Sequence, residues 1–529
     1  MEKFCYRFIN VLFGTAMCGI MLLILFFQFA DYAEKKDFML SNLSILGILI
    51  IFFILCLVIH HFLKNRILFR LNQQEINYDK TVLIFSAVLF VGQAYVCYNI
   101  FFLTGWDARL VRDSAQLLAT GNMNIEMQAY YGDYYYSYYP NNLFIFYLTA
   151  LILKVNNSIG IFTGEYTMMS TVLVNCIINT CTCLLVYKTA NLFVEKKFAF
   201  IGYCISVLLF GFSPWSVIFY SDSVGLIIPI LVFYLYVRPI SHKILRYVFR
   251  CAALAIGVIG YFVKPQSAIM LIAIMLIEII RLLNGFKVKK LIRPLALFLV
   301  CVVCFLTVTQ AINVTSKKIG FNIDPDKKIG ATHFFMMGLE ESTGGTYSQD
   351  DVDFSKSFKT VEERKIANIK SSIERLKGMG IIGYIKHISK KMLTTFNDGT
   401  FAWNNEGGFY LYVPNECNKR ASGFLRNVYY GDGMLNRYFL LFEQTIWILV
   451  LIGCIISVVL KNKASGNSKT VILRLAVLGL ILFECLFEVR ARYLYTFAPV
   501  FCILAILGIK QISQVAKKIM QHLVLKRGN

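Results

Sequence analysis

The stretch FINVLFGTAMCGIMLLILFFQFA, residues 8–30, decides the fold class, because it contains no charged side chain. About 20 apolar residues in a row are enough to cross the hydrocarbon core of a bilayer as a helix. The stretch is too long for the apolar core of a signal peptide, and no small-residue cleavage site follows it. We therefore interpret it as a membrane span that the protein keeps.

Similar apolar segments recur almost to the end of the 529-residue chain. Hydrophobic residues make up 57% of the sequence and charged residues 16%, with a mean hydropathy of +0.61. Soluble proteins are about 45–50% apolar and about 25% charged, so we predict an all-α polytopic membrane protein. We expect twelve spans: residues 8–30, 42–63, 81–104, 166–187, 198–215, 217–237, 247–263, 266–284, 291–312, 439–460, 470–487 and 494–512.

The net charge of +22 does not indicate nucleic acid as a partner. No nucleic-acid motif is present, and the basic residues cluster in short loops between spans, as the positive-inside rule predicts for cytoplasmic loops. Placing these clusters inside puts both termini in the cytoplasm. The clusters are Lys64, Arg66, Arg70 and Lys80; Lys287, Lys289, Lys290 and Arg293; and Lys510, Lys517, Lys518, Lys526 and Arg527. Most of the 15 cysteines lie in or beside apolar segments, which disfavours a disulfide framework.

One further apolar segment, residues 140–155, is ambiguous. The lysines Lys188, Lys196 and Lys197 mark a cytoplasmic loop, so a single crossing fits between an outer residue 105 and Lys188. We therefore expect 140–155 to dip into the outer leaflet, with a thirteenth span as the alternative.

This topology divides the chain into three parts. Residues 1–312 form an N-terminal transmembrane module whose first outer loop is 105–165, residues 313–438 form a second outer loop, and residues 439–529 form C-terminal spans with a basic tail. Within 361–396, apolar residues recur at near-helical spacing. We expect amphipathic helices there, broken at Gly378–Gly380 and lying on the membrane surface.

Two carboxylates stand at predicted outer ends of spans. Asp107 follows Gly-Trp in GWDARLVRD (105–113), where it is either a solvated acid beside an interfacial tryptophan or a general base that takes a proton from a hydroxyl. Asp222, in SPWSVIFYSDS (213–223), is either a helix cap or a second acid of the same site, with Tyr220 beside it.

Three cations occupy the same predicted face. Lys264 lies between two apolar runs in YFVKPQS (261–267), and an ionisable residue at such a depth is a functional candidate. Arg490 and Arg492, in FEVRARYLYTFAP (487–499), lie outside against the positive-inside bias. Because arginine forks bind phosphate oxygens in two-point geometry, the three residues predict an anionic, lipid-anchored head group.

The stretch YYYSYYPNN (134–142) opens the 140–155 segment. Tyr138, Tyr139, Asn141 and Asn142 are either an aromatic belt at the interface or side chains that hydrogen-bond a sugar. An aromatic belt explains the tyrosines but not the asparagines. In the long loop, His333 and Asp351 are candidates for acceptor binding, with a structural role as the alternative.

These motifs resemble the GT-C superfamily of integral-membrane glycosyltransferases, and within it bacterial enzymes similar to protein O-mannosyltransferases and the aminoarabinose transferases of lipid A. The resemblance covers most of the chain: GWD, YYPNN, residues 185–214, FYSDS, VKPQ, HFFMMGL with GGTYSQDD (333–351), and EVRARYLYTFAP. It implies a GT-C-like helical bundle, a polyprenyl-phosphate sugar donor and inversion at the anomeric carbon. The family's catalytic aspartate maps to Asp107, and a second acidic position maps to Asp222. A lone aspartate stands where O-mannosyltransferases carry an Asp-Glu pair, so their acceptor specificity does not transfer.

The sequence therefore predicts a bacterial cytoplasmic-membrane glycosyltransferase with its active site on the outer face. In this hypothesis Asp107 is the base, the three cations hold the donor phosphate, and a cell-envelope glycan or lipid-linked molecule is the acceptor. No metal-ligand cluster is visible in the sequence, although some related enzymes use a divalent cation. The alternatives are a polysaccharide polymerase or ligase that uses polyprenyl-diphosphate glycans, and a flippase or transporter of lipid-linked sugars.

Overall fold

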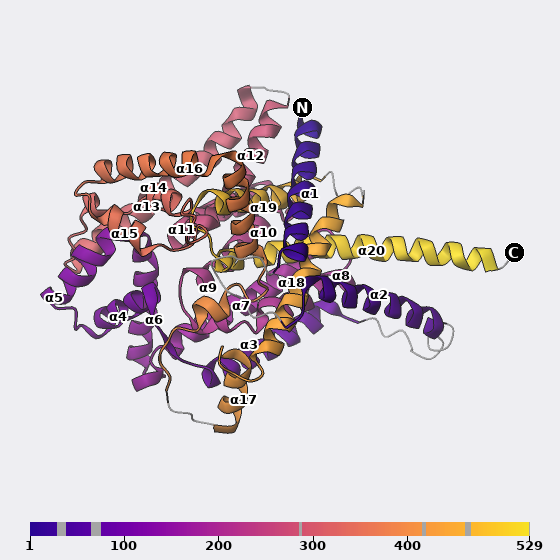
Figure 1. Cartoon of the computed structure of the whole chain (residues 1–529), viewed down its shortest axis with the longest axis horizontal. Coiled ribbons are helices and arrows are strands. Elements are labelled where there is room, and N and C mark those ends of the chain that lie inside the picture. The colour runs from indigo at the N-terminus through magenta and orange to yellow at the C-terminus, as the bar shows by residue number, and fades with distance from the viewer. Residues whose placement is uncertain (29–38, 65–75, 285–287, 415–418, 461–466, 528–529) are drawn as a thin grey trace.

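The computed structural model describes residues 1–28, 39–64, 76–284, 288–414, 419–460 and 467–527. The chain is an all-α polytopic membrane protein (Figure 1). Ala30, Arg66, Arg70 and Lys287, on which the topology prediction drew, lie outside the described residues. Among the described residues, nine helical segments are long and apolar enough to cross a membrane: Glu2–Phe26, Tyr78–Asn99, Pro140–Ile159, Gly164–Ala190, Lys243–Val263, Pro265–Leu283, Pro294–Lys318, Asn436–Val459 and Ala491–Lys518.

Each of the twelve predicted spans overlaps a helix. The helices are α1 (Glu2–Phe26), α2 (Asn42–Lys64), α3 (Tyr78–Asn99), α7 (Met169–Ala190), α8 (Lys196–Ser206), α9 (Ser221–Gly225), α10 (Ile228–Val237), α11 (Lys243–Val263), α12 (Ala268–Leu283), α13 (Val288–Lys318), α18 (Asn436–Val459), α19 (Ser468–Leu486) and α20 (Ala498–Arg527). Four predicted spans are not among the nine segments, namely 42–63, 198–215, 217–237 and 470–487. The 217–237 span is divided into α9 and α10 near Pro229, and α19 carries Lys469, Arg474 and Glu484 along its length.

Further elements connect these helices. They are α4 (Trp106–Thr120), α5 (Ile125–Met127), α6 (Leu143–Ile159), α14 (Ala331–Met337), α15 (Gln349–Lys356), α16 (Val361–Phe396), α17 (Lys419–Tyr429), and the 3-10 or π segments η1 (Gln128–Tyr136), η2 (Pro140–Asn142), η3 (Gly164–Tyr166), η4 (Val207–Gly211), η5 (Pro214–Val217), η6 (Pro265–Ser267), η7 (Pro325–Lys327), η8 (Trp403–Gly407) and η10 (Ala491–Phe497). Two short strands, β1 (Leu103–Thr104) and β2 (Tyr410–Tyr412), pair antiparallel and join the long loop to the start of α4.

The segment at 140–155 is longer than predicted, because η2 and α6 together are long enough to span a membrane. The contacts around it nevertheless constrain the topology. The Tyr166 ring stacks on the Tyr98 ring, near the end of α3, with a centroid distance of 5.2 Å. Lys196, which follows α7, pairs with Asp79 at the start of α3 at 2.5 Å. Helices α3 and α7 therefore run antiparallel, with the end of α3 beside the start of α7. Because these two ends lie on the same side of the membrane, the chain between them crosses it an even number of times. For this reason α6 is not the sole crossing between them.

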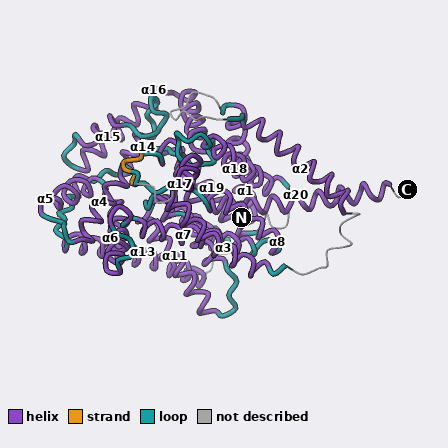
Figure 2. Tube along the Cα trace, turned by 90° about the horizontal axis from the view of Figure 1, so that it is seen from below, coloured by secondary structure: helices purple, strands orange, loops and turns teal. Residues whose placement is uncertain are grey.

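Loops that the charge rule places in the cytoplasm contact one another. Besides the pair of Lys196 with Asp79, Lys510 Nζ lies 3.2 Å from Glu195 Oε2. Asn284 Nδ2 donates a hydrogen bond of 3.0 Å to Glu2 Oε2. The contacts therefore join the start of α3, the residues between α7 and α8, and Lys510 of α20 into one set, and the start of α1 and the end of α12 into a second set. The ends of α2 and α20 lie at one end of the molecule, and α4, α5 and α15 lie at the other (Figures 1 and 2).

The long loop between α13 and α18 contains α14 to α17, and its longest helix has the predicted break. Helix α16 begins with a capping box between Thr360 and Glu363, and Gly380 interrupts it with φ 59° and ψ −175°. Only glycine adopts this conformation readily. On either side of the break, the helix exposes isoleucines such as Ile366 and Ile381, which are 60% and 82% exposed. These faces suit the predicted contact with a membrane surface.

Candidate functional site

Asp107 lies in the first turn of α4, directly after a strained residue. Trp106 has φ 44°, in the left-handed region that bulky side chains avoid. The Trp106 ring packs edge-on against the Tyr220 ring with centroids 5.0 Å apart. On another side, the Arg492 guanidinium lies 4.8 Å from the Trp106 ring centroid. These contacts stabilise the turn and place Asp107 beside the segment that carries Arg492.

Arg490 and Arg492 contact the same carboxylate. Arg490 Nη1 lies 3.1 Å from Glu406 Oε1, and Arg492 Nε lies 2.9 Å from Glu406 Oε2. Arg490 Nε also donates to Glu488 Oε1 at 2.8 Å. Because the two arginines would repel each other without a partner, Glu406 keeps both guanidinium groups together in one pocket wall.

Glu406 is held by a turn that is itself strained. It lies on the π-helix η8, a rare helix type that recurs at functional sites. Phe401 and Ala402, just before η8, have φ values of 55° and 63°. Asp398 Oδ2 accepts a 2.9 Å hydrogen bond from the Ala402 amide, and the buried Trp215 indole donates to the Phe401 carbonyl at 3.1 Å. Such strain persists only where the surroundings hold it, and it clusters at functional sites.

Asp222 and Lys264 form a buried ion pair behind this wall. The Lys264 ammonium group lies 4.4 Å from the Tyr493 ring centroid, and Asp222 Oδ2 lies 3.9 Å from Arg492 Nη1. As predicted, the helix restarts at Pro265, directly after Lys264. Neither Asp222 nor Lys264 is among the residues that line the pocket. The pair contacts the lining through the ion pair of Asp222 with Arg492.

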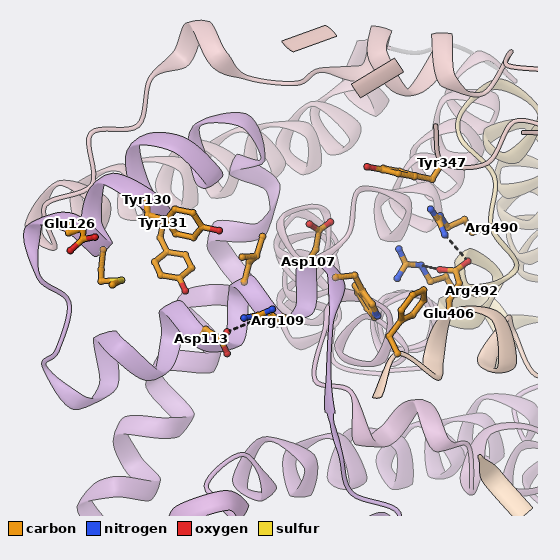
Figure 3. A pocket seen from close by; sticks show the side chains of 14 residues that line it. Asp107, Arg109, Asp113, Glu126, Tyr130, Tyr131, Tyr347, Glu406, Arg490 and Arg492 are labelled. Carbon is orange, nitrogen blue, oxygen red and sulfur yellow. Dashed lines mark hydrogen bonds and ion pairs between the residues drawn. The ribbon is translucent and has the colours of Figure 1, made fainter. Parts of the chain in front are cut away.

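These groups surround a pocket of about 910 Å³ (Figure 3). That volume is near the upper end for small-molecule sites. Asp107 lies between two groups of side chains, and the arginines lie on one side of it. The labelled residues on that side are Tyr347, Glu406, Arg490 and Arg492, and those on the other side are Arg109, Asp113, Glu126, Tyr130 and Tyr131. Trp106, Leu110, Met127 and Phe409 complete the lining.

The environment of Asp107 makes it a stronger proton acceptor than a solvent-exposed aspartate. Burial raises the pKa of Asp107, while the Tyr135 hydroxyl and the positive charges of Arg492 and Arg490 act in the opposite direction. A raised pKa brings a carboxylate closer to the range in which a general base works well. Within the described residues, no group of three or more His, Cys, Asp or Glu side chains is arranged to hold a metal ion.

The two predicted asparagines lie beside the pocket and are not part of its lining. Asn142 is buried, donates a 2.8 Å hydrogen bond to the Tyr135 hydroxyl and accepts one of 3.0 Å from Tyr220. It therefore links the tyrosine next to Asp107 with the tyrosine that packs on Trp106. Asn141 is exposed and donates to the Asn142 side chain at 3.2 Å.

The two predicted tyrosines of the same stretch contact a lysine of α15. The Lys356 ammonium group lies 4.9 Å from the Tyr138 ring centroid and 5.5 Å from that of Tyr139. Tyr134 contributes a third ring at 5.5 Å. The rings thus attach α15 to η1 and to the residues that follow η1 through cation–π contacts, outside the lining of the pocket.

His333 lies in a buried hydrogen-bonded cluster of the long loop. Its Nδ1 lies 2.7 Å from Ser355 Oγ, and burial lowers the pKa of His333 to about 4. Asp351 accepts two hydrogen bonds, of 2.9 and 2.6 Å, from the Arg375 guanidinium. Neither residue lines the pocket, so these contacts match the structural alternative for both.

Three important residues of the site, Glu406, Glu488 and Tyr347, were not predicted from the sequence. Glu488 lies two residues before Arg490 within FEVRARYLYTFAP, and Tyr347 lies in the GGTYSQDD stretch. Glu406 belongs to WNNEGG, which carries no periodic or motif signal. The available cue was charge balance, because arginines in a low-dielectric site need carboxylate partners.

Comparison with known proteins covers nearly the whole chain. A family model described as conserved hypothetical integral membrane protein matches residues 1–513. A search of curated proteins finds no match. The family description agrees with the membrane-spanning fold and carries no statement of activity.

Proposed function

We propose that this chain, which belongs to the family of conserved hypothetical integral membrane proteins, is a membrane glycosyltransferase. It moves a sugar from a polyprenyl-phosphate donor to a cell-envelope glycan or lipid-linked acceptor, at the outer face of a bacterial cytoplasmic membrane. The observation that carries this proposal is a single pocket lined by one carboxylate of raised pKa, Asp107, and two guanidinium groups, those of Arg490 and Arg492.

In the proposed reaction, Asp107 takes the proton of the acceptor hydroxyl. The hydroxyl oxygen forms a bond with the anomeric carbon as the bond between that carbon and the phosphate oxygen breaks, which inverts the configuration. Polyprenyl phosphate leaves with the bonding electron pair. Arg490 and Arg492 stabilise the growing negative charge, and fixed cations at such a position lower the barrier by several kcal/mol.

The guanidinium groups of the two arginines have the donor geometry that a phosphate requires. Glu406 lies between them, and in the proposal a phosphate oxygen makes the same kind of contact as its carboxylate. Arg492 makes ion pairs there, yet its buried Nε has no hydrogen bond of good geometry. In the proposal a phosphate oxygen accepts a hydrogen bond from this Nε. The buried pair of Asp222 and Lys264 supports Arg492 from behind, so we assign it a positioning role.

The grouping of the loops supports the proposed orientation. Asp79, Glu195, Lys196 and Lys510 form one basic set of contacts, which includes the start of α3 and a residue within α20. The pocket residues Asp107 and Arg492 lie beyond the opposite ends of these two helices. If the basic set faces the cytoplasm, as the positive-inside rule requires, the pocket opens toward the outside. Polyprenyl carriers present their head groups at this level of the bilayer.

The test is a transfer assay with the purified protein in proteoliposomes. Radiolabelled undecaprenyl-phosphate hexoses are the donors, and envelope polymers from cells that lack the gene are the acceptors. We expect transfer by the unmodified protein and a loss of about a hundredfold in Arg492→Ala. Arg437→Ala is the control, because Arg437 is exposed and lies outside the pocket lining.

The same assay separates the proposal from the rival function of a polysaccharide polymerase or ligase. That function shares the outer loop and the arginines, but it uses polyprenyl-diphosphate glycans. We expect monophosphate donors to be consumed and diphosphate glycans to be left intact. Consumption of the diphosphate glycans alone would overturn the proposal in favour of the polymerase.

A further inference from the structure

We propose that the tyrosine-lined half of the pocket is a separate subsite for an uncharged saccharide. This inference rests on the proposed function, in which the subsite would hold the acceptor. The residues that form it are Arg109, Asp113, Tyr130 and Tyr131, from α4 and η1. They lie on the opposite side of Asp107 from the arginine pair (Figure 3).

Tyr130 presents aromatic surface at a well-defined place, and the buried ring of Tyr131 packs against it. Tyr130 is 51% exposed, Tyr131 is 8% exposed, and their rings meet edge to face with centroids 4.9 Å apart. Both stand on the nine-residue π-helix η1, and π-helical turns recur at functional sites. A saccharide offers C–H faces that pack on such rings and hydroxyl groups that bond the tyrosine hydroxyls.

Close packing holds η1 in position. A Cβ added at Gly132 would lie 2.5 Å from the Phe321 ring, so η1 rests directly on that ring. Asn322, the next residue, donates its amide proton to Asp133 Oδ1 at 2.9 Å. A rigid aromatic surface is what a weakly binding ligand such as a sugar requires, because little entropy is then lost on binding.

The charges of this half favour an uncharged ligand. Asp113 is paired with Arg109 at 3.3 Å and with Arg112 at 2.7 Å. Glu126 adds a negative charge to the lining on the same side. Arg112 lies outside the lining, and with its charge included the four groups sum to zero. Sugar hydroxyls donate to carboxylates and accept from guanidinium groups, so a neutral saccharide can hydrogen-bond both members of these ion pairs.

The position of Asp107 gives the subsite a consequence for the reaction. Because the carboxylate lies between the two halves, a saccharide on the tyrosines can bring a hydroxyl to Asp107 while a phosphate occupies the arginines. Both substrates would then be bound at once. Tyr130 and Tyr131 therefore determine which acceptor reacts, and they do not contribute to donor binding.

A binding experiment tests the subsite directly. Saturation-transfer NMR on the detergent-solubilised full chain would use two neutral probes, maltotetraose and an N-acetylglucosamine tetramer, and one charged probe, a glycerol-phosphate tetramer. We expect at least one neutral probe to bind, with a Kd at least fivefold weaker in Tyr130→Ala. The control is Tyr134→Ala, which removes a half-exposed tyrosine of the same π-helix outside the pocket lining. Because Tyr131 is buried, Tyr131→Phe serves as its milder variant.

The outcomes separate this inference from the proposed function. Neutral probes that bind Tyr130→Ala as tightly as the unmodified protein, or that do not bind at all, would overturn the subsite. Binding of the charged probe alone would also overturn it. Donor consumption in proteoliposomes is measured on the same variants. If saccharide binding depends on Tyr130 while no polyprenyl-phosphate sugar is consumed, the subsite stands and the proposed reaction fails.

Discussion

Arg492 Nε lies 2.9 Å from Glu406 Oε2, and the other oxygen of this carboxylate lies 3.1 Å from Arg490 Nη1. The arginines come from the start of η10 and the glutamate from η8, so the contact ties the long loop to the C-terminal helices. Glu406→Ala would leave two guanidinium groups, whose side chains are only 18% and 13% exposed, without their shared partner. We expect the free energy of unfolding to fall by about 3 kcal/mol and the KM for the donor to rise about tenfold.

Denaturant unfolding in detergent and donor titration in proteoliposomes check this prediction. Glu362→Ala is the control, because the Glu362 side chain is 69% exposed. An unchanged unfolding free energy together with an unchanged donor KM would contradict the role of Glu406 in holding the arginines.

The second prediction concerns the planar guanidinium group of Arg492. Arg492→Lys keeps the positive charge but removes the planar donor pair and the stacking on Trp106. We expect the donor KM to rise about tenfold while the acceptor KM stays unchanged, measured by varying each substrate in turn. Equal changes in both constants would show that the fork does not bind the phosphate specifically.

The pH dependence of transfer follows from the environment of Asp107. Burial raises the pKa of Asp107, and the base must be ionised to accept a proton. We therefore expect kcat/KM to fall as the pH drops through this raised pKa, with a midpoint above the usual value of about 3.9. Arg490 lowers the pKa of Asp107, so Arg490→Gln should move the midpoint to higher pH. A midpoint that moves to lower pH would contradict the assignment.

His333 predicts a pH effect on stability alone. Burial lowers its pKa to about 4, whereas in the unfolded chain it titrates near 6.5. Between these values the unfolded state binds a proton that the folded state does not. The stabilisation is therefore complete above pH 6.5 and declines by about 3 kcal/mol as the pH falls towards 4.

Unfolding free energies of His333→Gln and the unmodified protein, measured from pH 7 to pH 4, check this. The variant should show a shallower decline, with transfer activity retained at pH 7. Parallel declines in the two proteins would contradict a neutral buried histidine.

Apolar length predicted most of the fold, because each span must satisfy its own backbone hydrogen bonds. All twelve predicted spans overlap helices, and the break at Gly380 lies where paired glycines indicated it. Length could not show that 217–237 divides into α9 and α10, or that α6 extends to Ile159. The division falls near Pro229 at the start of α10, and the extent of α6 depends on tertiary contacts, such as the packing of α4 along α6.

The candidate site was predicted in part, and the reason lies in the kind of signal each residue carries. Asp107, Arg490 and Arg492 were conspicuous as charges at the ends of apolar segments, and they line one pocket. Asp222 and Lys264 are also charges at the ends of apolar segments, yet they form an ion pair with each other and do not line the pocket. Glu406 lies in a loop without periodicity, and only folding brings it between the arginines.

The most direct measurement is sugar transfer by Asp107→Asn, made alongside donor binding in the same proteoliposomes. The variant keeps the size of the side chain and removes its ability to accept a proton. We expect kcat to fall by about a hundredfold or more while donor binding persists, and Asp350→Asn, a change at an exposed aspartate of α15, to leave both unchanged. Full transfer activity in Asp107→Asn, with the protein inserted and folded, would contradict the account.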